Sequence, residues 1–150
     1  TLPISIIAWI LTLILFMNHN IEDILVDDRL IFVVNLRKRS WFYRIFFERR
    51  GWAGWSFGNV VFVGDIFINE NKWNQLVVHE CEHCFQQYKW GVFWYPVYFI
   101  ESVWLWFKTK KKHSYLDNRF EREARRVAGQ RVDIPPELWP EGPKDRWILW

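Results

Sequence analysis

One long segment without proline or internal glycine, from Asn74 to Gly91, limits the possible folds more than any other part of the chain. It reads NQLVVHECEHCFQQYKWG, which predicts a helix that Gly91 ends. Within it, His79, Glu80 and His83 form an HExxH pattern. Helical residues follow one another at about 100°, so the two histidines lie about 40° apart and project from one face. Two imidazoles on one face suit a tetrahedral zinc ion, and Glu80 borders that face, where it can act as the general base toward a zinc-bound water.

Zinc in an enzyme needs a third protein ligand and one open position, which directs attention to a second predicted helix. Asp117 or Asn118 can cap this helix, which runs to about Gly129. Glu121 and Glu123 lie in its first turns. Glu121 can be the third zinc ligand, or it can be the capping-box partner of Asn118, three residues before it. The residues alone leave both roles open.

Further side chains near these motifs are candidates for supporting roles. Gln86 continues the ligand face of the first helix and can fix a ligand histidine by a hydrogen bond. Tyr115 and His113 precede the second helix, and either can donate to an oxyanion in the transition state, or serve only in packing or at the surface. His113 is also a candidate zinc ligand. Cys81 and Cys84 point away from the ligand face, so we expect two buried, reduced thiols and no disulfide.

The two motifs together resemble known families. An HExxH helix followed by a glutamate in an E-x-x-A helix resembles the gluzincin zinc peptidases, and the segment from Glu121 to Ala124 is similar to the E-x-x-A-D signature of CAAX-prenyl-protease-type peptidases. The chain is more similar still to a group of small bacterial and phage proteins with the pattern HExxH-x-x-Q-x-x-x-W-G, an aromatic segment, and then Y-x-x-N-x-F-E-x-E-A. The matching residues are His79, Glu80, His83, Gln86, Trp90, Gly91, Tyr115, Asn118, Phe120, Glu121, Glu123 and Ala124.

This resemblance covers roughly residues 58 to 126, and it implies a zinc site. By it, zinc binds His79, His83 and Glu121, with Glu123 as the other candidate for the third ligand, and Glu80 is the catalytic base. One position departs from the peptidase signature, because Arg125 stands where that signature has an aspartate. Since that aspartate commonly supports a ligand histidine, the support must come from elsewhere in this chain.

The rest of the middle region predicts a small sheet, so the expected fold class is α+β. Leu30 to Leu36 is a short β-branched run typical of a strand, and Asn59 to Asn69 predicts a hairpin that turns at Gly64-Asp65. Trp41 to Phe47 fits either a helix or a strand. The hairpin beside the HExxH helix is either plain scaffold or an exposed edge that holds an extended peptide.

Two uncharged or nearly uncharged segments predict hydrophobic helices, one N-terminal and one central. Residues Thr1 to Met17 carry no charge, and we expect a membrane anchor or an interfacial helix; a helix of the soluble core and a processed signal are the alternatives. Val92 to Phe107 is rich in Trp and Tyr and is followed by Lys108 and Lys110–Lys112, which suits an anionic membrane surface as well as a core helix with a charged exit. The expected organisation is therefore a segment 1–17, a zincin-like domain 18–133, and a tail 134–150 rich in Pro and Trp.

Composition narrows the classes of function. Aromatic residues make up 20% of the chain, with 12 Trp, and a chain of this kind can offset its ordering entropy by burial, which excludes a disordered protein. The net charge of +3 is too small to argue for a nucleic-acid partner.

The sequence therefore favours a membrane-associated zinc metallopeptidase that acts on a peptide or protein, with its catalytic domain on the cytoplasmic side. A structural or interaction protein of a virion or membrane assembly, which binds partners through Trp-rich surfaces and lacks catalysis, is the main alternative. A membrane-binding protein without hydrolytic activity is a third.

Overall fold

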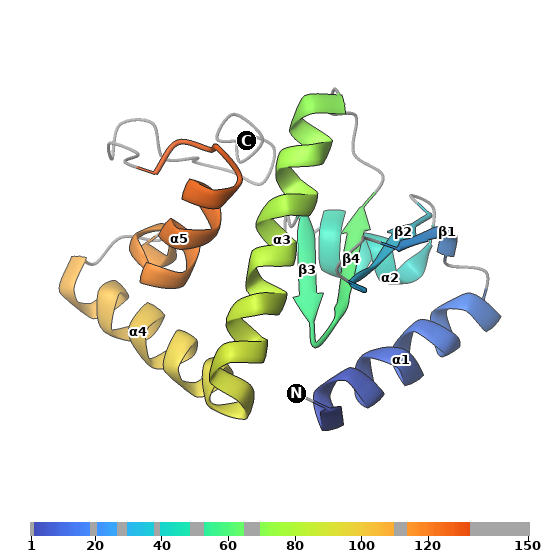
Figure 1. Ribbon diagram of the computed structural model, residues 1–150, viewed down its shortest axis with the longest axis horizontal. Coiled ribbons are helices and arrows are strands. Elements are labelled where there is room, and N and C mark those ends of the chain that lie inside the picture. Colours follow the sequence, from blue (N-terminus) through green and yellow to red (C-terminus); the bar gives the residue numbers. More distant parts are fainter. Residues whose placement is uncertain are drawn as a thin grey trace.

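The chain folds into an α+β structure, as the sequence predicts (Figure 1). The computed structural model describes residues 2–18, 21–26, 30–37, 40–48, 53–64, 70–109 and 114–132. The elements are α1 (Leu2–Met17), β1 (Ile21–Val26), β2 (Phe32–Leu36), α2 (Trp41–Tyr43), a π-helical turn η1 (Arg44–Glu48), β3 (Gly54–Phe57), β4 (Val60–Gly64), α3 (Glu70–Trp90), a 3₁₀ turn η2 (Gly91–Phe93), α4 (Trp94–Thr109), a second 3₁₀ turn η3 (Ser114–Asp117) and α5 (Arg119–Val127). The tail 134–150 and His113 lie outside the described residues.

The four strands form one mixed sheet in the order β1-β2-β4-β3. Strand β2 pairs with β4 in parallel, and β1 and β3 pair antiparallel with β2 and β4 respectively. The predicted strand at Leu30 to Leu36 is confirmed, but the predicted turn at Gly64-Asp65 is wrong. Because β4 already has a neighbour on each side, it has no free side for a later strand. The hairpin instead joins β3 to β4 through Gly58-Asn59, and residues 65–69 lie outside the described residues.

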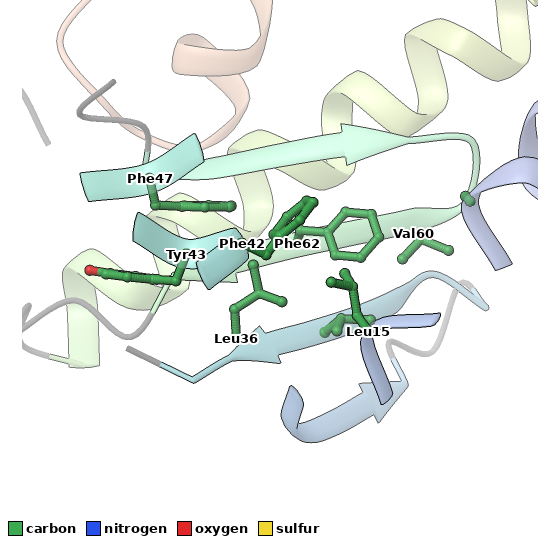
Figure 2. Close-up of a cluster of buried hydrophobic side chains, with 9 residues drawn as sticks. Leu15, Leu36, Phe42, Tyr43, Phe47, Val60 and Phe62 are labelled. Carbon is green, nitrogen blue, oxygen red and sulfur yellow. The ribbon is translucent and has the colours of Figure 1, made fainter. Parts of the chain in front are cut away.

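Strand β4 is buried on both faces, which explains its unbroken apolar sequence. On one face, Val60 and Phe62 pack with Leu36 of β2, with α1 and with α2 in a cluster that Figure 2 shows from the side. The cluster consists of Ala8, Leu15, Val34, Leu36, Phe42, Tyr43, Phe47, Val60 and Phe62. The aromatic segment at Trp41 to Phe47, which fits either secondary structure by sequence, is helical and covers this face of the sheet.

On the opposite face, Val61 and Val63 pack against α3. Leu76, Cys81 and Cys84 of α3 complete this second cluster, and both cysteines are buried and reduced, as expected. The HExxH helix is therefore held by the sheet through the face that does not carry its histidines.

Helices α4 and α5 lie on the other side of α3 from the sheet (Figure 1). Pro96 lies in the first turn of α4, where a proline costs no hydrogen bond, so it begins this helix without a kink. Asn118 caps α5 by accepting from the backbone N–H of Phe120 at 2.9 Å, and its side-chain amide donates to the Tyr98 carbonyl and to Ser102 Oγ of α4. Among the described helices, none has the length and apolar character needed to cross a bilayer.

Candidate metal centre

Three buried side chains from α3 and α5 bring their donor atoms to one point. His79 Nε2 and His83 Nε2 lie 3.1 Å apart, and each lies 3.4 Å from a carboxylate oxygen of Glu121. The histidines come from successive turns of α3, and Glu121 comes from the first turn of α5, which packs against α3. His79, His83 and Glu121 can therefore hold a metal ion.

The spacing of the two imidazole nitrogens fits a tetrahedral zinc ion. Two ligands that each lie about 2.0 Å from a tetrahedral zinc are about 3.3 Å apart. The two Nε2 atoms are 3.1 Å apart, close to this value, and the Glu121 carboxylate faces His79 with Oε2 and His83 with Oε1, each at 3.4 Å. A donor set of two imidazoles and one carboxylate also suits zinc and its transition-metal neighbours better than calcium or magnesium, which prefer oxygen ligands.

Two glutamines turn the imidazoles toward the centre. Gln86 Oε1 lies 2.9 Å from His83 Nδ1, and Gln130 Oε1 lies 3.1 Å from His79 Nδ1. The orientation of the Gln86 amide is fixed because its nitrogen donates to the Phe120 carbonyl and to Glu123. An oxygen facing each Nδ1 places a hydrogen on that nitrogen, which leaves both Nε2 atoms available to a cation.

Glu80 lies beside this group and against the edge strand β3. Glu80 is 6% exposed, and a Cβ added to Gly54 would come within 2.6 Å of Glu80 Cγ and 2.7 Å of its Oε1. Burial raises the pKa of Glu80 to about 7, against the opposing effects of the His83 charge and a hydrogen bond from Ser56. A carboxylate with a pKa near neutrality is suited to accept a proton at physiological pH.

Glu121 is held by α4 as well as by the histidines. The Tyr98 hydroxyl donates to Glu121 Oε1 at 2.6 Å, and burial raises the pKa of Tyr98 well above its usual value, so it remains a donor. Trp94 stacks on Tyr98 and contacts the ring of His83. The buried guanidinium of Arg125 also acts on Glu121 through its charge.

The charges of the three side chains depend on one another. Burial alone would raise the pKa of Glu121, but His83 and His79 outweigh burial and hold that pKa well below its usual range. Burial acts to lower the pKa of His83, whereas Glu121 raises it, and the result is about 9. Burial lowers the pKa of His79. Without a metal, one proton on His83 therefore balances Glu121, and a metal ion must displace that proton.

The structure separates the two acidic candidates for the third ligand. Glu121 is buried and faces both histidines, whereas Glu123 is exposed and accepts from Gln86 Nε2 at 3.1 Å. Glu121 does not serve as the capping-box partner of Asn118, because its carboxylate faces the histidines. The tyrosine that contacts Glu121 is Tyr98 of α4, and Tyr115 lies in η3 near Tyr98 and Arg125.

Three residues of the centre escape the sequence patterns. Gln130 supplies the support for His79 that Arg125 cannot supply from the signature position. It reaches the site because Gly129, with φ of +67°, reverses the chain after α5. Tyr98 lies in a segment that reads only as hydrophobic, and Gly54 reads only as part of a loop. Of these three residues, only Gln130 has a signal in the sequence, namely the helix-ending Gly129 before it.

Comparisons with known proteins add no relative. A scan of protein-family models, a search of curated proteins and a search of solved structures found no match to this chain.

Proposed function

We propose that this chain is a zinc-dependent peptidase in which His79, His83 and Glu121 hold the metal and Glu80 is the general base. The observation that carries the proposal is the convergence of two imidazole nitrogens and a carboxylate, with a second carboxylate on the same helix beside them. When bound, zinc lowers the pKa of a coordinated water to about 7 and polarises a carbonyl group.

The residues around the metal have separable roles in this chemistry. Glu80 accepts a proton from the attacking water and returns it to the leaving amine. Gln86 and Gln130 hold the imidazoles in the tautomer that leaves Nε2 free. Tyr98 holds the Glu121 carboxylate in place, and Trp94 and Tyr98 exclude water from the side of His83.

The sheet offers a place for an extended substrate. Among the described strands β3 is at the edge, and its Gly54 backbone contacts Glu80. Gln87 occupies the Ser56 carbonyl, so a peptide would pair with the Gly54 end of this edge, next to the general base. This favours a peptide over a compact small molecule as the substrate.

Replacement of the base tests the proposal. Glu80→Gln should retain zinc but abolish hydrolysis of an unfolded protein substrate, because an amide cannot accept the proton. Glu82→Gln, two residues further along α3, is the matched control and should retain both properties. Undiminished turnover by Glu80→Gln with zinc bound would refute the assignment.

The burial of the centre favours one alternative, a structural metal site. All three ligands are buried, as in sites whose metal only stabilises the fold. A structural site would bind a fourth protein ligand, whereas a catalytic site keeps a water there. Spectra of the cobalt-substituted protein distinguish the two, since only an open position responds to added azide or to a hydroxamate.

A further inference from the structure

The outer face of α4 consists mainly of apolar and aromatic side chains, with Lys108 at its end. Seven residues of α4 and of the turn before it are between 51% and 69% exposed: Val92, Phe93, Phe99, Ile100, Trp104, Trp106 and Phe107. The charged residues of α4 are Glu101 and Lys108. Glu101 forms an ion pair with Arg119 of α5 at 3.0 Å, on the inner side of the helix. No described residue covers the outer face, which is larger than the scattered apolar groups usual on a soluble surface.

The inner face of the same helix is fully used by the fold. Trp94 is buried, Tyr98 donates to Glu121, and Ser102 accepts from Asn118. The outer face is therefore not needed for packing within the described fold, because the inner face of α4 already makes the contacts with α3 and α5. A helix that uses its inner face in the fold and also exposes a large apolar outer face requires a second apolar environment for that outer face.

Helix α1 repeats this arrangement at the other end of the fold. It carries no charged residue, and its side facing away from the sheet exposes Leu2, Ile6, Ile7, Ile10, Leu13, Ile14, Phe16 and Met17. In Figure 1, α4 lies at the lower left and α1 at the lower right, and the C-terminal end of α3 lies between them. Two helices distant in sequence thus each present an exposed apolar face.

We propose that the outer faces of α4 and α1 form one surface that inserts into the interfacial layer of an anionic lipid bilayer. The residue types match this partner, because Trp residues favour the boundary between headgroups and acyl chains. Lys108 Nζ lies 4.8 Å from the Trp104 ring centroid at the end of the helix, and three more lysines follow at positions 110–112 of the sequence. This charge complements anionic headgroups. The hydrogen-bonding groups of this face are the indole N–H groups of Trp104 and Trp106 and the ammonium group of Lys108, all of which suit lipid headgroups.

The surface lies close to the candidate metal centre. Tyr98 contacts Glu121 from the inner face of α4, and a helix with side chains is about 10 Å across, so about one helix width separates the bilayer from the ligands. One consequence rests on the proposed function: the substrate of the peptidase is a chain segment that lies near the bilayer surface.

Vesicle flotation of the full chain tests the surface without reference to metal or activity. Wild type should float with vesicles of phosphatidylcholine mixed with phosphatidylglycerol, less with phosphatidylcholine alone, and less at high salt. The double variant Phe99→Ser, Trp104→Ser should lose about a hundredfold in vesicle affinity, at about tenfold for each aromatic side chain. Val92→Ser should weaken binding severalfold, whereas the control Val127→Ser on α5 should not, although these valines are equally exposed at 53% and 52%.

Three results would overturn the proposal. In the first, the wild-type chain does not float with vesicles of any lipid composition. In the second, Val92→Ser and Val127→Ser lose vesicle affinity equally. In the third, the wild type is a dimer, the double variant is a monomer, and neither binds vesicles. The last result, measured by light scattering, would assign the face to a second copy of the chain. Circular dichroism of each variant checks that the fold is retained.

Discussion

Replacing Gly54 with alanine should displace the general base without removing the metal. The added Cβ would lie 2.6 Å from Glu80 Cγ and 2.8 Å from Glu80 Cδ. Ordinary carbon contacts begin at about 3.4 Å, so Glu80 or β3 must move by nearly 1 Å. Strand β3 is held by its pairing with β4 and by Gln87, whose amide donates to the Ser56 carbonyl at 3.3 Å. The side chain of Glu80 is the part that gives way.

A displacement of this size has a predictable cost. Misplacing a catalytic group by about 1 Å reduces the rate about a hundredfold. We therefore expect kcat of Gly54→Ala to fall about a hundredfold on an unfolded protein substrate, with unchanged zinc content. The three atoms nearest the added Cβ all belong to Glu80 and none belongs to a metal ligand, so metal affinity should remain that of wild type.

Gly91→Ala is the matched control for the loss of a glycine. Nothing lies within 4 Å of a Cβ at Gly91, but its φ of +59° makes alanine unfavourable there by about 1–2 kcal/mol. This variant should unfold at a lower temperature and keep its kcat. Full activity of Gly54→Ala, or an equal kcat loss in both variants, would refute the placement of Glu80 by β3.

Three further predictions concern the metal and the core. Gln130→Ala should weaken zinc affinity about 10- to 100-fold in a chelator competition, whereas Asn74→Ala, at an exposed position of α3, should not. Zinc binding should release about one proton at neutral pH, because the His83 pKa of about 9 means that a proton must leave Nε2. Zinc affinity should therefore rise with pH up to about 9 and level off above it. Calorimetry in two buffers of different ionisation enthalpy measures the released proton, and its absence would contradict this prediction. Phe62→Ala should cost about 3–5 kcal/mol of unfolding free energy by denaturant titration, because Phe62 is fully buried in the sheet, whereas Trp41→Ala at an exposed position should cost about 1 kcal/mol or less.

The parts of the fold with a strong local signal are those that the sequence predicts. The HExxH helix and the Asn118-capped helix have long periodic patterns with cap residues at their ends, and both are found where expected. The position of the hairpin turn was wrong because two dipeptides, Gly64-Asp65 and Gly58-Asn59, are equally favourable for a turn. Only Gly58-Asn59 lies between two strands that pair with each other. Which glycine turns the chain depends on strand pairing, and pairing between β2 and β4 joins segments more than 20 residues apart.

The supporting residues of the metal centre are unpredictable for a related reason. Tyr98 and Gln130 reach Glu121 and His79 only through the packing of α4 and α5 against α3. No spacing rule links a tyrosine on one helix to a glutamate on the next. The ligand pair on α3 follows from helical periodicity alone, whereas the rest of the centre depends on tertiary structure.

The metal content of the purified protein tests the central claim most directly. Wild type, purified without chelator, should contain about one zinc per chain. His79→Ala and Glu121→Ala should lose it, and Glu123→Ala should keep it, because Glu123 binds Gln86 and not the metal. A wild-type protein without metal that also fails to take up added zinc, or an equal loss in Glu121→Ala and Glu123→Ala, would contradict the three-ligand centre.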